Sequence, residues 1–259
     1  MLKKSLLWKL TKEEGPTSFL FGTMHVKDEA AFTFAQKAIN HLQMCDSFYA
    51  EMDLNEASTA IKPTDYLMDD NMSLKNYFKE KKYAKYKRIV LKSFSLNLDN
   101  YQYLKPIIIL NNLAESVMSS DNARPLDHFL WHQAELLNLK LGGLETVDEQ
   151  VSTLKSLEIE LQLKMLKKAL KNISSFKSSN QILKTLYAQQ DIIKIFKLSN
   201  KGLGKLRQPL LYVRNRIMAD RIAQYANKRS FFAVGAAHLG GNKGVLKLLK
   251  SKGFKLKPL

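Results

Sequence analysis

Two histidines of this chain follow the same short pattern, in which an apolar run leads to Gly-x-x-His. The first copy spans residues 18–26 (SFLFGTMHV), and the second spans residues 231–239 (FFAVGAAHL). In both copies four mostly apolar residues precede the glycine, and one aliphatic residue follows the histidine. Imidazole binds metal ions and carries protons near neutral pH. Two imidazoles in matching positions are therefore the first candidates for chemistry.

The pattern is typical of a buried β-strand that ends close to the glycine. Gly22 and Gly235 would permit a turn or a close backbone approach that a side chain would block. His25 and His238 would then follow the carboxyl ends of their strands, where ligands bind in open α/β sheets. Two such histidines could converge on one metal ion or one substrate. The alternative is two ordinary strand ends, but the other three histidines lie in different contexts, so the repeat favours a shared site.

An amide within an apolar helix stripe is a further candidate. The pattern of residues 208–226 predicts a helix whose apolar stripe contains Asn215, next to Arg214. A buried amide costs stability unless it forms hydrogen bonds. One interpretation is structural: Asn215 ties the helix to the sheet and Arg214 forms an ion pair. The other is functional: both side chains reach a site that holds negative charge.

A competing histidine pair lies in the middle of the chain. His128 and His132 are four residues apart in a helix predicted for residues 126–138, so they share one face. The segment lacks the glutamate of the His-Glu-x-x-His zinc motif, although Asp127 and Glu135 are nearby. The helix has a mostly amphipathic scaffold pattern. We therefore rank this pair below the two strand-end histidines.

The elements that must position these residues alternate along the chain. Strands are predicted at residues 5–11, 18–23, 47–53, 140–145, in the run up to Gly235 and at 254–256, and helices at 28–43, 74–93, 106–118, 126–138, from 146, and at 157–171, 180–197, 208–226 and 245–249. This order predicts an α/β (α+β) fold with a central mixed sheet, flanking helices and an inserted helical subdomain. The largely helical region 55–205 is either a lid over the sheet or simply more helical bundle. Glu51 lies near a strand end, as does Asp53, which is more typical of a loop or capping acid.

The net charge of the chain is strongly positive, at +17, with 41 basic and 24 acidic residues. Only seven of the basic residues are arginines, and the lysines are spread along most of the predicted helices. Specific nucleic-acid recognition favours arginine and recognisable motifs, and no such motif is evident. We predict no specific nucleic-acid partner, with weak attraction to anionic surfaces as a secondary property.

Cysteine content and hydropathy bear on the compartment. Cys45 is the single cysteine, which excludes an intramolecular disulfide and a thiolate metal cluster. No apolar run approaches the ~20 residues of a transmembrane helix. Lys9 interrupts the first apolar segment too early for a signal peptide. We expect a cytoplasmic protein, or a secreted or periplasmic one if the sequence has been trimmed; the oligomeric state is not predicted.

The sequence resembles the TraB/GumN family, which includes pheromone-shutdown proteins and the Tiki metalloproteases. The resemblance rests on LLWKL with FLFGTMHV, YAEMD, LDHFLWHQA leading to LGGLETVDEQ, VRNRIMA, and FFAVGAAHLGGNKGVLKLLKSKGF. These segments span nearly the whole chain in the family's order, and the last is the most specific. Residues 55–120 match in little beyond helical character. Residues 1–259 are therefore interpreted as a single TraB/GumN-like domain.

The resemblance implies a metal-dependent hydrolase, a peptidase or amide hydrolase acting on a peptide or protein, with functional positions at His25, Glu51, Arg214, Asn215 and His238. Two imidazoles and a carboxylate are a common ligand set for Mn, Co or Zn. Such an ion acidifies water and polarises a carbonyl. Glu51 would be either a metal ligand or the general base. Arg214 and Asn215 would stabilise the developing oxyanion.

Two other classes of function stay open on the sequence alone. One is a non-catalytic protein that binds a peptide or a haem-like ligand in the same cleft. The other is a basic helical protein that binds nucleic acid or membrane. Bound metal without hydrolysis would indicate the first, and steeply salt-dependent binding to nucleic acid would indicate the second.

Overall fold

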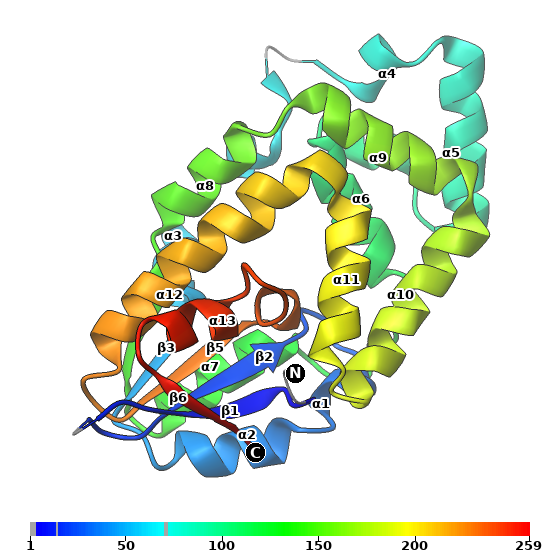
Figure 1. Cartoon of the computed structure of the whole chain (residues 1–259). Helices are drawn as coiled ribbons and strands as arrows, with labels where there is room; N and C mark the ends of the chain where they lie inside the picture. Colours follow the sequence, from blue (N-terminus) through cyan, green and yellow to red (C-terminus); the bar gives the residue numbers. More distant parts are fainter. Residues whose placement is uncertain (1–3, 14, 70–71) are drawn as a thin grey trace. The chain divides into compact units, whose positions relative to one another are not determined.

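The computed structural model describes residues 4–13, 15–69 and 72–259 (Figure 1). The chain forms two compact units. The sheet unit comprises the residues up to Ala60 together with Ser119–Gln150 and Ile182–Leu259, and the helical unit comprises Ile61–Met118 and Val151–Gln181. Every residue singled out above for chemistry belongs to the sheet unit.

The sheet unit is built on a six-stranded mixed sheet in the order β4-β3-β5-β2-β1-β6. Its strands are β1 (Leu7–Thr11), β2 (Ser18–Thr23), β3 (Ser47–Met52), β4 (Lys140–Glu145), β5 (Ser230–Gly235) and β6 (Lys255–Pro258). β4, β3, β5 and β2 run parallel, whereas β1 is antiparallel to β2 and β6. The predicted fold class is confirmed, and the strands predicted at residues 5–11, 18–23 and 254–256 correspond to β1, β2 and β6.

The central strands β2 and β5 are buried along nearly their whole length, as is usual for parallel strands covered by helices. All six residues of β2 are buried, and so are five of the six in β5. Phe48 of β3 stacks on Phe231 of β5, with ring centroids 6.0 Å apart, and meets Trp131 edge-on. The edge strand β6 instead alternates lysine with half-buried residues, a pattern that discourages pairing with another chain.

Helices form the remainder of the sheet unit. They are α1 (Glu29–Phe32), α2 (Ala35–Leu42), α3 (Leu54–Ala60), α7 (Leu126–Leu136), α11 (Ile192–Leu203), α12 (Arg214–Tyr225) and α13 (Val245–Ser251), with α8 (Val147–Lys155) and α10 (Ile173–Ala188) shared between the units. α2 packs against α7, and α12 packs against α13 (Figure 1). The helix predicted from residue 146 begins with a capping box: Thr146 Oγ1 accepts from the Glu149 N–H at 3.1 Å, and the Glu149 carboxylate accepts from the Thr146 N–H at 2.8 Å.

Three helices predicted as continuous are broken. Residues 28–43 form α1 and α2 with a turn between them, and residues 74–93 contain a break before Glu80. Residues 180–197 divide between α10 and α11, where Gln190 takes a left-handed φ of 54° and Asp191 caps α11 by accepting from the Lys194 N–H. Periodicity missed these breaks because the helices on either side each bury an apolar stripe.

The helical unit contains no strand within its described residues. Its elements are η1 (Pro63–Tyr66), α4 (Leu74–Tyr77), α5 (Glu80–Phe94), η3 (Leu98–Tyr101), α6 (Pro106–Glu115), α9 (Ile159–Lys171) and the first part of α10. α9 packs against both α5 and α6. Whether this region is a lid stays a prediction. Across the described residues of both units, none of the helices combines the length and apolarity needed to cross a membrane.

Candidate active site

Four neighbouring parallel strands end in residues capable of chemistry. In sheet order, Glu145 ends β4, Glu51 lies next to the end of β3, His238 follows β5, and His25 follows β2. Neighbouring strands lie about 4.8 Å apart, so the four residues share one edge of the sheet. The histidines thus follow neighbouring strands, as the repeated motif predicts. A single ion shared by the two imidazoles stays a prediction.

The two motif glycines lie at close approaches of the chain. A Cβ added to Gly22 would be 2.6 Å from Leu239 Cδ1 and 3.2 Å from Ala236 Cα, so its absence lets the 3-10 turn η6 (Ala236–His238) lie against β2. A Cβ on Gly235 would be 3.1 Å from Glu51 Oε1, and the Gly235 N–H donates to that oxygen at 2.7 Å. The first glycine therefore makes room for the second motif, and the second glycine holds Glu51.

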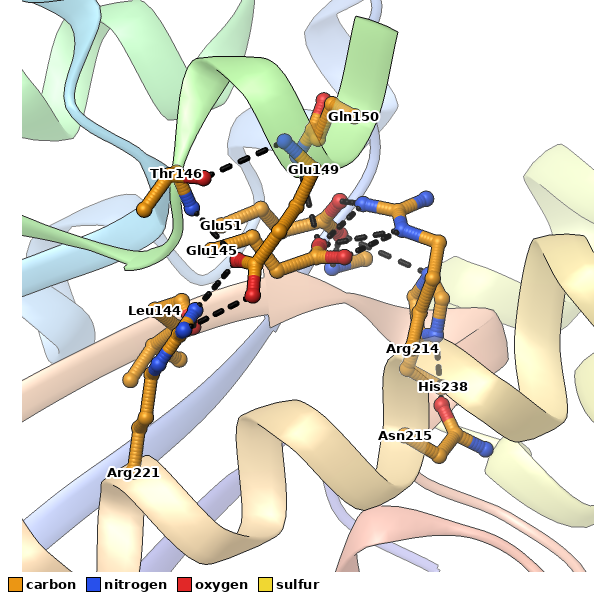
Figure 2. A network of polar contacts seen from close by, with 11 residues as sticks. Glu51, Leu144, Glu145, Thr146, Glu149, Gln150, Arg214, Asn215, Arg221 and His238 are labelled. Atoms are coloured by element: carbon orange, nitrogen blue, oxygen red, sulfur yellow. Dashed lines mark hydrogen bonds and ion pairs between the residues drawn. The ribbon is translucent and has the colours of Figure 1, made fainter. Parts of the chain in front are cut away.

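His238 is buried in a network that fixes its protonation pattern. The Asn215 amide nitrogen donates to the Lys243 carbonyl at 2.7 Å. Asn215 Oδ1 is therefore the acceptor that faces His238 Nδ1 at 2.6 Å (Figure 2). His238 Nδ1 therefore carries the proton, and Nε2 of the neutral ring keeps its lone pair. Nε2 lies 3.7 Å from Glu51 Oε1, too far for a hydrogen bond. Two ligands of one ion at about 2.1 Å each would be about 3.4 Å apart, so this pair fits a metal ion.

Arg214 joins the two strand-end glutamates. Its Nε donates to both carboxylate oxygens of Glu145 at 3.0 Å, and its Nη2 donates to Glu145 Oε2 at 2.6 Å and also to Glu51 Oε2 (Figure 2). The three groups carry a surplus of one negative charge when all are ionised, which favours a nearby cation. Sequence reasoning missed Glu145, although it ends its strand in LGGLE much as Glu51 ends its own in YAEM.

The pKa values in this network separate the two glutamates. Burial alone would raise the pKa of Glu51, but the charges of Arg214 and His238 and the Gly235 N–H bring it down to about 2. Burial outweighs the Arg214 contacts at Glu145 and raises the pKa of that carboxyl group. Burial also lowers the pKa of His238 to about 4, against the opposing effect of Glu51. At neutral pH Glu51 is ionised and His238 is a neutral imidazole, the form that binds metal.

A π-helical segment lies directly before Arg214 and Asn215, the first two residues of α12. The predicted helix over residues 208–226 begins as the π-helix η5 (Gln208–Val213) and continues as α12 from Arg214. π segments inside helices are frequent at functional sites. Asn215 is fully buried and joins α12 to the chain that follows β5, while Arg214 pairs with two carboxylates. The contacts are those of the structural interpretation, and the predicted oxyanion role of both residues stays a prediction.

His25 lies in a different setting, against the first turn of α7. Its Nδ1 is 2.6 Å from Asp127 Oδ2, and its ring centroid is 5.5 Å from that of His128. Ligand atoms of these three residues lie within 4.8 Å of one another. His132 instead contacts Glu135 at 3.3 Å. His128 and His132 therefore do not share one site: His128 lies beside His25, and His132 lies beside Glu135.

The predicted site residues thus form two groups. Glu51, Arg214, Asn215 and His238 make one network, and His25 belongs to a second with Asp127 and His128. Asp53 lies in neither of these contacts and caps α3, as the sequence suggested: its Oδ1 accepts from the backbone N–H groups of the next turn at 2.9 and 3.1 Å. The adjacent Asp-His pair at the start of the predicted helix was the available signal for the second group.

Comparison with known proteins gives a consistent set of relatives. The model of the TraB/PrgY/gumN family matches residues 6–258. Metalloprotease TIKI2 of Danio rerio is 25% identical over 97% of this chain and 60% of its own length. Metalloprotease TIKI1 of Homo sapiens is 24% identical over 97% of this chain and 61% of its own length, and a TIKI homolog of Nematostella vectensis is 21% identical. The chain spans about 60% of the length of these TIKI2 and TIKI1 relatives.

Proposed function

This chain belongs to the TraB/PrgY/gumN family, and on that premise we propose that it is a metal-dependent hydrolase that cleaves amide bonds in peptides or proteins. The name metalloprotease carried by its relatives supports the class. One observation carries the proposal. Both Gly-x-x-His histidines follow neighbouring parallel strands, and each has its Nδ1 within hydrogen-bond distance of a side-chain oxygen, as is common for metal-binding histidines.

The proposed metal ligands are His25, His238 and Glu51, which would hold a divalent ion of the Mn, Co or Zn class. The 3.7 Å separation of His238 Nε2 and Glu51 Oε1 and the surplus negative charge beside them both suit a cation. When bound, such an ion acts as a Lewis acid that polarises the amide carbonyl and acidifies water.

The other residues of the network prepare these ligands. Asn215 keeps the proton on His238 Nδ1, so that Nε2 faces Glu51. Arg214 keeps Glu51 ionised and fixes its orientation. A general base works best with a pKa near the operating pH, and the pKa of Glu51 is about 2. This difference favours Glu51 as a ligand over Glu51 as the base.

The test combines metal content with cleavage. Purified protein is dialysed against Mn, Co or Zn, its metal stoichiometry is measured, and a peptide library is screened for cleavage. His25→Ala and His238→Ala are each expected to lose both metal and cleavage, while Glu51→Gln loses metal affinity. His41→Ala is the matched control, because His41 lies in α2, where its Nδ1 contacts the Lys37 carbonyl and its ring meets Phe19 edge-on. Full metal and full activity in the double variant His25→Ala/His238→Ala would contradict the proposal, and bound metal without cleavage of any peptide would indicate a binding protein.

A further inference from the structure

The first turn of α7 brings a third imidazole to the candidate metal site. His128 follows Asp127 in that turn, and both lie beside His25 at the end of β2. The side chains of His25 and Asp127 are 55% and 24% exposed, and His128 is also exposed. An ion can therefore reach them from solvent without any opening of the core.

Asp127 has the contacts of a residue that orients a metal ligand. Its Oδ2 accepts the Nδ1–H of His25 at 2.6 Å. Its Oδ1 is buried and has no hydrogen-bond partner among the described residues, so the carboxylate's hydrogen bonding is directed at His25. Metal-bound histidines commonly donate their second N–H to a carboxylate, which fixes the tautomer and makes the ring a stronger ligand.

The distances also decide which atoms can bind an ion. Ligand atoms around one transition-metal ion are about 3 Å or more apart, so His25 Nδ1 and Asp127 Oδ2, at 2.6 Å, do not suit the same ion. If Asp127 keeps its hydrogen bond with His25 Nδ1, an ion at this position would be bound through His25 Nε2 and the imidazole of His128. The ring centroids, 5.5 Å apart, leave room for an ion between two nitrogen atoms.

We infer that His128 is a further metal ligand beside His25 and that Asp127 is the positioning residue that holds His25 for this role. The inference rests on the proposed function, because it extends the metal site of that proposal onto α7. It assigns a ligand that the paired Gly-x-x-His motif does not contain.

The chain supplies a matched control on the same helix. His132 lies one turn after His128 and its side chain is 42% exposed, but it contacts Glu135. His128→Ala and His132→Ala therefore make the same chemical change on the same helix. Asp127→Ala removes the acceptor for His25, whereas Asp127→Asn keeps an oxygen acceptor and removes the charge.

The experiment titrates the metal-free full-length chain with Co²⁺ and with Zn²⁺, by calorimetry and by the visible absorption of bound Co²⁺. We expect His128→Ala and Asp127→Ala each to weaken binding about tenfold or more, in the range measured when groups around a metal site are removed. Asp127→Asn should recover part of the loss, and His132→Ala should bind as the unaltered chain does. Thermal melting confirms that each variant is folded.

The outcomes separate this inference from the proposed function. If His128→Ala binds metal normally while His25→Ala and His238→Ala lose it, the inference is overturned and the proposed function stands. If His128→Ala and His25→Ala lose metal while His238→Ala and Glu51→Gln retain it, the inference stands and the proposed ligand set is wrong. An equal loss of metal binding in His132→Ala would contradict the assignment of His128 as a ligand. No recovery of metal binding in Asp127→Asn would contradict the positioning role of Asp127.

Discussion

The histidines of the two Gly-x-x-His copies lie in different environments. The His238 side chain is 7% exposed and belongs to a network with Asn215 and Glu51, whereas the His25 side chain is 55% exposed and lies beside Asp127. The difference begins after the glycines. Gly-Ala-Ala-His has residues small enough to form the 3-10 turn η6 against β2, whereas Gly-Thr-Met-His has larger residues and leads into open chain.

The two sides of this sheet edge therefore have different properties. The β5 side is rigid and preorganised, because buried hydrogen bonds fix the orientation of each side chain. The β2 side is accessible, so it is where we expect an ion and a substrate to enter. Two expectations can be tested: the β5 side is rigid, and the β2 side is independent of the β5 side.

The largest expected effect is from removal of Arg214. Arg214→Ala would leave Glu145 buried without its cation and Glu51 without its ion pair. Loss of one partner from a buried charge network costs about 3–5 kcal/mol, which should appear as a lower free energy of unfolding in urea. Arg229→Ala is the control, because its ion pair with Asp46 is exposed and should contribute little. If the two variants are equally stable, the β5 network is not the rigid side of the site.

The next effect is a pH dependence that should involve His238. The pKa of His238 is lowered to about 4, below its ordinary value of 6.5, chiefly because the ring is buried. As the pH falls, His238 is therefore protonated in the unfolded chain at a higher pH than in the folded chain. Stability from this group is complete above pH 6.5 and is lost between pH 6.5 and 4, by about 3 kcal/mol.

Urea unfolding at pH 7, 5.5 and 4 measures this loss. His238→Gln should reduce the slope of stability against pH in that window. An unchanged slope in His238→Gln would show that other groups cause the acid sensitivity.

A smaller pH effect should come from the β2 side, where Asp28 fixes the chain that follows His25. Asp28 is buried and accepts from the Ala30 N–H, from Ser119 and from Lys184 Nζ at 2.8 Å. Burial opposes ionisation, but these contacts lower the pKa of Asp28 from 3.8 to about 2. The stabilisation is complete above pH 3.8 and is lost as the pH falls through 2, by about 2 kcal/mol.

Asp28→Asn should remove this part of the acid sensitivity without changing the slope between pH 6.5 and 4. Unfolding measured between pH 4 and 2 gives the comparison. A variant whose slope is unchanged below pH 4 would show that Asp28 does not hold this segment.

The fold was largely predictable because strand-length apolar runs and helical periodicity report burial. The repeat predicted that His25 and His238 would follow neighbouring strands, since parallel strands of one sheet end at one edge. The break at Gln190 was not predictable from periodicity, because a left-handed residue interrupts the helix without interrupting the apolar stripe. The contact of His25 with Asp127 joins residues 102 positions apart, and only tertiary packing brings them together.

The smallest expected effect tests how the first motif supports the second. Gly22→Ala would place a methyl group 2.6 Å from Leu239 Cδ1 and 3.2 Å from Ala236 Cα, so η6 must move away from β2. Overpacking of this kind costs about 1–2 kcal/mol in the free energy of unfolding. Gly202→Ala is the control, because a Cβ there meets nothing within 4 Å and alanine favours the helix α11. Because η6 ends in His238, we expect Gly22→Ala also to weaken metal binding, although residue 22 contacts no proposed ligand directly. Normal metal affinity in a Gly22→Ala variant that is destabilised would show that the position of η6 matters for folding and not for the site.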